Sequence, residues 1–394
     1  MGQEIYNKAN NKFSVHSTLA FDTKQADNSN VDFQGNGWQD SRFGDGSWGG
    51  MRWALEEIYA DYEMPSGMTL WAGKRFYKRK DIHILDYYYH TYSGNGFGLE
   101  NIQVGNLGSV SFALMKSQTD HRNAVDAVTN NDNTYKIDAR WENIPMWSDA
   151  TLEVILNYAW QNASYKQKQN QQYWADRDGN EHPYHNNTSF LGLIEYTQGG
   201  FFGGFNKLSF TYGTNGFDNA GVGGYGKDVG SAAFPYPTRG TGTRFIDWGV
   251  IEQSKWNVGY VVMLGHLHIK DSDSNFGGWT AGRGGNYFTF AIRPAYKWSD
   301  FTSTVVEYGI STLPTSGWLR WREGYNQGLD KKDRLSASKL TIAQQWSPQT
   351  HFWARPSIRV FATWLSGSMM HHRETGYQSK NHEFIYGAQM EAWW

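Results

Sequence analysis

The chain contains no cysteine, which excludes disulfide bonds, thiolate nucleophiles and zinc–thiolate sites. Its formal net charge is −2, without the clustered basic excess that nucleic-acid binding requires. No apolar run reaches the length of about 18 residues that a transmembrane helix needs, and no signal-peptide pattern opens the sequence. These absences argue against a nucleic-acid partner and against a helical membrane protein.

Aromatic residues and glycine are abundant, whereas proline is scarce. The 394 residues include 19 Trp, 24 Tyr, 22 Phe and 44 Gly but only 9 Pro. The mean hydropathy is nevertheless −0.66, so the sequence is polar on average. A long chain that is aromatic, glycine-rich and polar indicates many strands joined by turns rather than a helical bundle.

Apolar and polar residues alternate with a period of two along much of the chain, as in strands with one apolar face. The segments 152–160, 288–298 and 384–394 follow this pattern, and their apolar faces tend to end in aromatic residues. A β-sandwich or soluble barrel with one wet face would also alternate. Segments of roughly ten residues with aromatic ends are typical of transmembrane barrels.

The connections between these segments alternate strictly between short and long. In an up-and-down barrel alternate connections lie at opposite rims, and outer-membrane barrels have short periplasmic turns and long extracellular loops. A Greek-key sandwich gives no reason for such regularity. The short connections are expected near 7–12, 63–68, 104–108, 141–149, 198–206, 252–256, 298–302 and 346–351. The long ones are expected near 23–50, 78–98, 117–134, 162–187, 213–243, 271–285, 312–334 and 366–382.

This pattern predicts an all-β, antiparallel transmembrane barrel with about 17 strands in the chain, the first around Gln3–Tyr6. Because bacterial single-chain barrels have even strand numbers, we expect a further strand and its loop upstream. Residues 1–394 are expected to form a single barrel domain. The ending AQMEAWW is typical of a closing strand at the lipid interface.

The stretch KRFYKRKDIHILDYYYH, residues 74–90, is too charged for a core and too aromatic for an ordinary surface loop. In a barrel this wide the lumen is not filled by wall side chains, so a loop can fold inward and narrow it. Sugars suit this mixture, since aromatic rings stack on their C–H faces while charged groups exchange hydrogen bonds with their hydroxyls. We therefore interpret this stretch as an inward-folded constriction loop in a sugar channel.

Long strings of the sequence resemble the maltoporin family of outer-membrane sugar porins. They include LWAGKRFYKRKDIHILDYYY, SGNGFGLENI, RPAYKW, LTIAQQW, WARPSIRVFAT and GAQMEAWW, in that order, and the resemblance runs over nearly the whole chain. It implies a barrel of about 18 strands in the bacterial outer membrane, assembled as a homotrimer and surrounded by outer-membrane lipid. It also implies passive diffusion of maltose and maltodextrins or related oligosaccharides, with no enzymatic activity and no cofactor.

The resemblance further implies an aromatic slide for the sugar rings. Trp353 in WARPSIRVFAT and Trp393 in EAWW match members of it, and so does Phe234 in GSAAFPYP. Trp38 and Trp48 are both candidates for a slide residue that a neighbouring subunit supplies. The alternation places Trp393 opposite Trp394, facing inward, and groups Trp353 with Arg355, Arg359 and Thr363 on an inward face.

A polar track is implied beside the slide. Arg79, Asp81 and Asp86 match the constriction residues of the family, and Tyr88 matches the tyrosine that narrows the bore. Arg52 stands at the spacing of a further track residue.

Three other interpretations compete with the porin. Asp81 and Asp86 could be the carboxylate pair of a glycoside hydrolase, but the neighbouring Arg79 and Lys80 would hold both ionised, whereas a general acid must keep its proton. A soluble carbohydrate-binding β-module would also display aromatic side chains. The calcium-like starts DSDSN and DRDGN do not continue into a full calcium loop, so no metal site is expected.

Overall fold

The computed structural model describes residues 2–23, 51–122, 129–162, 173–175, 181–183, 187–215, 240–269, 285–314, 334–367 and 382–392. Apart from η2, a 3-10 turn at His83–Leu85, the regular structure of this part of the chain consists of strands. No helix in these ranges has the length and hydropathy needed to cross a membrane. The strands are β1 Gly2–Lys8, β2 Asn11–Thr23, β3 Met51–Glu63, β4 Thr69–Ile82, β5 Tyr87–Gln103, β6 Ser109–Arg122, β7 Thr129–Pro145, β8 Ala150–Asn162, β9 Tyr173–Ala175, β10 Glu181–Pro183, β11 Asn187–Phe201, β12 Gly204–Thr214, β13 Gly240–Glu252, β14 Trp256–Ile269, β15 Gly285–Lys297, β16 Thr302–Pro314, β17 Arg334–Trp346, β18 Ser357–Ser366 and β19 His382–Glu391.

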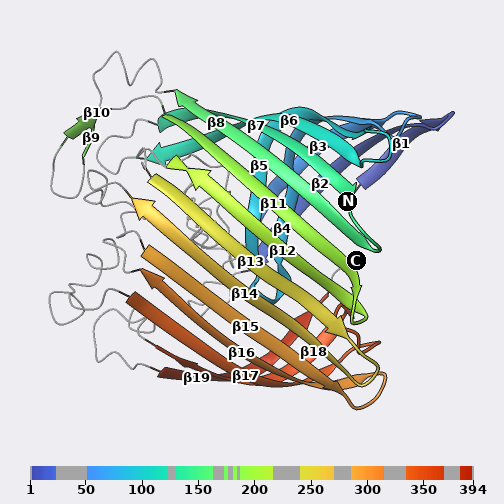
Figure 1. Ribbon diagram of the computed structural model, residues 1–394, viewed down its shortest axis with the longest axis vertical. Coiled ribbons are helices and arrows are strands. Elements are labelled where there is room, and N and C mark those ends of the chain that lie inside the picture. Colours follow the sequence, from blue (N-terminus) through green and yellow to red (C-terminus); the bar gives the residue numbers. More distant parts are fainter. Residues whose placement is uncertain are drawn as a thin grey trace.

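All strands except β9 and β10 belong to one 17-stranded sheet, and those two pair with each other. Each strand of the large sheet pairs antiparallel with the next one along the chain, and β8 pairs with β11. The strands are strongly tilted, and the sheet curves around β4 and β5 in the interior (Figure 1). The prediction of an up-and-down antiparallel barrel with about 17 strands in this chain is confirmed.

The short connectors gather at one rim, on the right in Figure 1. They occupy residues 9–10, 64–68, 104–108, 146–149, 202–203, 253–255, 298–301 and 347–356. All eight fall where the sequence places them, although the last extends five residues beyond its expected end. Two long connections are wrong in part: only residues 83–86 separate β4 from β5 within the expected 78–98, and β6 and β7 occupy residues 117–122 and 129–134 of the expected 117–134.

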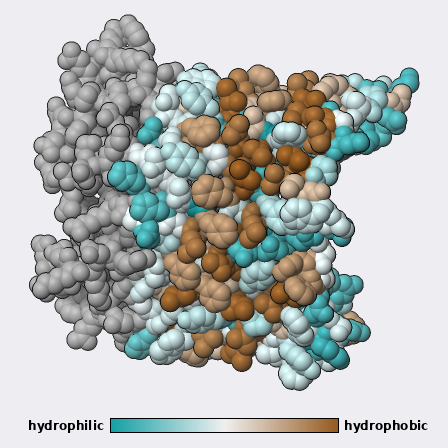
Figure 2. Space-filling view, in the orientation of Figure 1, coloured by the Kyte–Doolittle hydropathy of each residue, from teal (hydrophilic) through white to brown (hydrophobic). Residues whose placement is uncertain are grey.

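The two faces of the sheet differ as the alternation predicts. On β8, Leu156 and Tyr158 are 48% and 45% exposed on the outer face, whereas Asn157 between them is 1% exposed on the inner face. On β7 the inward residues Lys136, Asp138 and Arg140 are buried and charged. Figure 2 shows apolar side chains gathered across the middle of the outer surface, with hydrophilic ones toward the right-hand rim. The wall is therefore apolar outside and polar inside, the opposite of a water-soluble barrel.

Candidate functional site

The hairpin of β4 and β5 leaves the wall partway along its length. The register between β3 and β4 ends at the pair Ile58–Lys74, and the register between β5 and β6 begins at Asn95–Lys116. Within the described ranges, the residues between these points have ladder partners only in each other. We call residues 75–94 the inner hairpin, because their side chains contact the inner face of distant wall strands.

Two lysines fix the inner hairpin to the inner face of the wall. Lys78 forms an ion pair with Glu142 on β7. The ammonium group of Lys80 lies 2.5 Å from a carboxylate oxygen of Glu153 on β8 and 2.8 Å from one of Glu195 on β11. The Glu195 side chain is only 2% exposed. Because a buried charge that loses its partner is strongly destabilising, these pairs hold the hairpin in one position.

Hydrogen bonds extend this attachment to a fourth wall strand. Arg244 on β13 donates from its guanidinium group to the Tyr87 hydroxyl, at 3.0 Å, and to the Tyr89 carbonyl oxygen. A ring nitrogen of His90 lies 2.9 Å from the side-chain oxygen of Asn157 on β8. The inner hairpin thus packs along the inner face of the wall from β7 to β13.

The tip of the inner hairpin rests against β14 and β15. Gly259 on β14 makes this approach possible, since a Cβ atom there would lie 2.6 Å from the Phe352 ring and 3.0 Å from the Ile84 side chain. Arg293 on β15 donates to the Ile84 carbonyl oxygen at 3.5 Å. Phe352 belongs to the connector between β17 and β18, residues 347–356, which therefore folds inward beneath the tip.

His83 joins the tip to this connector. Its ring centroid is 5.1 Å from that of Trp353, and its Nε2 atom accepts a hydrogen bond from Arg355 at 3.2 Å. His83 lies in η2, outside both strands of the hairpin. Burial lowers its pKa, Arg355 and Arg293 lower it further, and Glu391 and Asp81 oppose them. A neutral imidazole is the form that can accept the Arg355 hydrogen bond.

The opposite face of the inner hairpin carries the predicted constriction residues. The guanidinium carbon of Arg79 lies 3.9 Å from the Phe76 ring centroid and 4.6 Å from that of Tyr88. Asp81 is the ladder partner of Tyr88 and is exposed. Asp86 ends η2 in the left-handed conformation and is also exposed. The structure thus places all four on one short hairpin, with charges and rings side by side.

Trp353 does not lie in a strand, so the alternation that grouped it with Arg355 and Arg359 does not apply. β18 begins only at Ser357, and the connector before it has no period of two. Trp353 still lies inside the barrel, 38% exposed, with its ring against His83 and near-parallel to that of Phe205 at 6.4 Å. The expected inward position is therefore correct, but the reason given for it is wrong.

Two aromatic residues of this region are absent from the sequence prediction. Phe205 on β12 and Trp248 on β13 meet edge to face at 4.9 Å, and Phe205 continues to Trp353. Phe205 could have been predicted from the alternation along residues 204–214, which places it on the sheet face opposite to that of the outward Phe210. Together these rings form a continuous aromatic surface near the short-turn rim.

Several predicted site residues cannot be compared with the structure. Phe234, Trp38, Trp48 and Trp393 lie outside the described residues. Arg52 lies on β3, where its backbone pairs with Asp22, but its side chain is outside the description. Among the residues that are described, no group of His, Asp and Glu has the arrangement of a metal site.

The sequence of the chain matches known channels over its length. A family model described as LamB porin matches residues 1–394. The maltoporin of Vibrio cholerae serotype O1, strain El Tor Inaba N16961, is 32% identical over 375 residues, which cover 91% of this chain and 78% of that protein. The maltoporin of Photobacterium profundum is 32% identical over 329 residues, covering 82% and 65% of the two chains.

Solved structures also align with the fold at low identity. OmpT of Vibrio cholerae has a TM-score of 0.39 at 10% identity, covering 93% of this chain and 89% of that one. The outer-membrane channel DcaP of Acinetobacter baumannii has a TM-score of 0.37 at 8% identity, covering 92% of each chain.

Proposed function

Because this chain belongs to the LamB porin family, we propose that it carries maltose, maltodextrins or related oligosaccharides through its lumen by passive diffusion. The chain is an outer-membrane channel and not an enzyme. Its interior supplies fixed hydrogen-bond donors and acceptors, which suit the hydroxyl groups of a sugar. It also supplies aromatic faces, which suit the apolar C–H faces of the sugar ring. Binding that is weak at each of several sites lets a solute enter and leave.

The observation that carries the proposal is the division of the inner hairpin into two faces. One face is fixed to the wall through Lys78 and Lys80. The other presents Arg79, Asp81 and Tyr88 toward the interior, so that a rigid backbone supports the groups that meet the solute. We assign the hydroxyl contacts at the narrowest point to these three residues and to Asp86, with Arg52 as a further member of the track.

We propose that an aromatic slide contacts the apolar faces of the sugar rings. Trp353 supports this assignment, because its ring is partly exposed and continues into Phe205. Phe234, Trp393 and Trp38 complete the proposed slide on the basis of the family resemblance alone. We also propose that three copies assemble and that lipid surrounds them, which suits the apolar outer wall in Figure 2.

The alternatives from the sequence find no support. A soluble carbohydrate-binding module would not place residues such as Leu156 and Tyr158 on an exposed apolar wall. A glycoside hydrolase needs an acid that keeps its proton, usually through burial, whereas Asp81 and Asp86 are both exposed.

Reconstitution in a planar bilayer tests the proposal. Maltodextrins added to the bath should reduce the ion current in a saturable manner, and conductance should appear in steps of three if the trimer is correct. Incubation with maltodextrin should release no new reducing ends. Current that is insensitive to every maltodextrin tested would overturn the assignment of substrate.

A further inference from the structure

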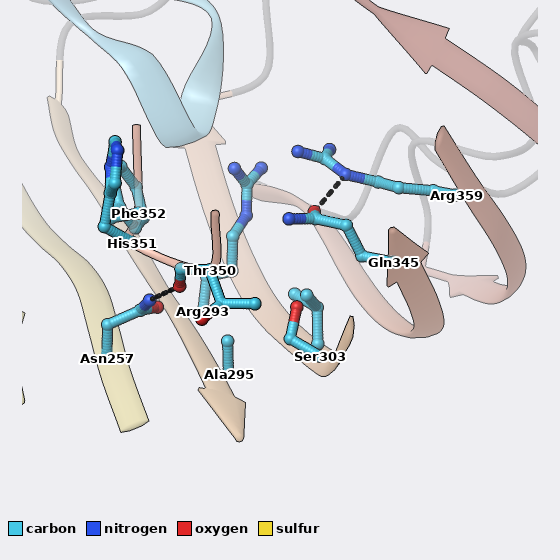
Figure 3. A pocket seen from close by; sticks show the side chains of 10 residues that line it. Asn257, Arg293, Ala295, Ser303, Gln345, Thr350, His351, Phe352 and Arg359 are labelled. Atoms are coloured by element: carbon cyan, nitrogen blue, oxygen red, sulfur yellow. Dashed lines mark hydrogen bonds between the residues drawn. The ribbon is translucent and has the colours of Figure 1, made fainter. Parts of the chain in front are cut away.

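A small cavity opens on the inner wall between the connector 347–356 and strands β14 to β18. Its volume is about 20 Å³, enough for about one water molecule. Asn257, Ser303 and Gln345 line it and are almost completely buried, and Arg293 and Arg359 stand at its rim. Figure 3 shows both guanidinium groups turned toward this space, Arg293 from β15 and Arg359 from β18.

The positive charge around this cavity exceeds the negative charge among the described residues. Arg293 and Arg359 line the cavity, and together with Arg355 and Lys339, which lie beyond it, they share two carboxylates. Glu307 pairs with Arg293 and Lys339, and Glu391 pairs with Arg355 and Arg359. Arg293 adds to the effect of burial in lowering the pKa of Arg355, which shows that these cations are within electrostatic reach of each other. Arginine stays charged in such surroundings, so the excess positive charge persists.

Donors remain available on both rim arginines. Arg359 uses Nε for the Gln345 side-chain oxygen at 2.7 Å and Nη2 for Glu391 at 3.2 Å. Arg293 uses Nε for Glu307 and Nη2 for the Ile84 carbonyl oxygen. Each therefore keeps one further nitrogen, Nη1, without a described partner. Both side chains are 17% exposed, so a solute in the lumen can reach them.

We propose that Arg293 and Arg359 form a binding site for an oxyanion, either a free phosphate or the phosphate group of a sugar ester, beside the proposed sugar path at Trp353. Two planar guanidinium groups with a free edge each are suited to an anion with several oxygen atoms. The buried Ser303 and Asn257 side chains give the cavity further hydrogen-bonding groups. The site lies at the short-turn end, below the tip of the inner hairpin.

The test is ion-current block in a planar bilayer, with inorganic phosphate and glucose 6-phosphate as probes and glucose as the neutral reference. Both anions should reduce a potassium chloride current at concentrations where glucose does not. Arg293→Gln and Arg359→Gln should each weaken phosphate block by about ten- to 150-fold, in keeping with loss of one charged hydrogen bond. Arg359→Lys, which retains the charge but not the planar group, should lie between wild type and Arg359→Gln.

Lys207→Gln is the matched control. Lys207 is also an interior cation, beside Glu195 and Trp248, but it does not line the cavity. Block by phosphate that is absent in the wild type, or that Lys207→Gln weakens as much as Arg359→Gln, would overturn the proposal. The heat-dependent mobility shift of a folded barrel on a gel checks that each variant is folded. Since phosphate is tested without maltodextrin, failure here is distinguishable from failure of the sugar assignment.

Discussion

Arg79 lies over the face of Tyr88, with 4.6 Å between the guanidinium carbon and the ring centroid. The contact joins the two strands of the inner hairpin on the face turned away from its wall attachments. A cation over an aromatic face is attractive, so each residue restrains the other. A flat ring and a charged group are thereby held at one place in the lumen.

Tyr88→Ala should widen the bore and raise the single-channel conductance by roughly a factor of two, because we propose that the Tyr88 ring narrows the aqueous path. Planar-bilayer recording measures this directly. Tyr158→Ala removes an equivalent ring from the outer wall, where Tyr158 is 45% exposed, and should leave the conductance as it is. An unchanged conductance in Tyr88→Ala would mean that this ring does not line the path.

Lys80→Met should destabilise the folded channel by about 3–5 kcal/mol, since it leaves the buried carboxylate of Glu195 and the half-buried one of Glu153 without their shared cation. Equilibrium unfolding in urea from detergent micelles measures the loss. Lys12→Met is the control: Lys12 and Glu63 are 40% and 43% exposed, and an exposed pair contributes about 0–1 kcal/mol. Equal losses in the two variants would contradict the anchoring role of Lys80.

Trp353→Ala should weaken maltodextrin block of the ion current. The expected loss is about 1–3 kcal/mol, the range for aromatic stacking on nucleic-acid bases. Titration of the current with maltotriose gives the blocking constant. Trp364→Ala deletes an outward tryptophan that is 45% exposed and should not change it. If the two variants behave alike, Trp353 is not part of the sugar path.

Gly259→Ala should displace the hairpin tip, because the added Cβ meets the Phe352 ring and Ile84. Overpacking of this kind costs about 1–3 kcal/mol, which thermal unfolding can detect. Gly192→Ala is the comparison, since a Cβ there approaches nothing closer than 3.7 Å. A stable Gly259→Ala channel with wild-type conductance would show that the tip does not depend on this contact.

The hairpin tip should loosen in acid. The folded-state pKa of His83 lies below its ordinary value of 6.5, so the stability that its neutral form contributes is present above that value. This contribution is lost as the pH falls through the folded pKa, where a protonated His83 would add a third positive charge beside Arg355 and Arg293. Current noise should therefore rise at acidic pH in the wild type and rise less in His83→Gln. Identical pH profiles of current noise in the wild type and in His83→Gln would show that His83 is not the group responsible for the acid loosening.

The alternation of polar and apolar residues is sufficient to predict the wall strands and the short turns between them. Each wall strand turns its polar side chains toward the lumen and its apolar side chains outward. Leu156 and Asn157 already show this in the sequence. The inner hairpin was expected to be an inward loop, and its position is correct, but its regular ladder was not expected. The hairpin sequence lacks the period-two alternation of the wall strands, because neither of its faces meets lipid. Both faces meet protein or channel water, and charged and aromatic residues occur on both.

The wall residues that anchor the inner hairpin could not be predicted from local patterns. Lys80 forms ion pairs with Glu153 and Glu195, which are 73 and 115 residues away in the sequence. Nothing in the sequence near Lys80 indicates which acidic residues it pairs with. Trp353 shows a second limit. Counting alternate residues backward from β18 crosses into an irregular connector, where the direction of a side chain depends on contacts with His83 and Phe205.

The attachment of Lys80 to two separate strands also constrains the order of folding. Its carboxylate partners stand together only after β8 and β11 have paired, and closing chain segments of 73 and 115 residues carries an entropic cost that local hairpins avoid. The passage therefore receives its final shape late in folding, when a cylinder of strands already surrounds the hairpin.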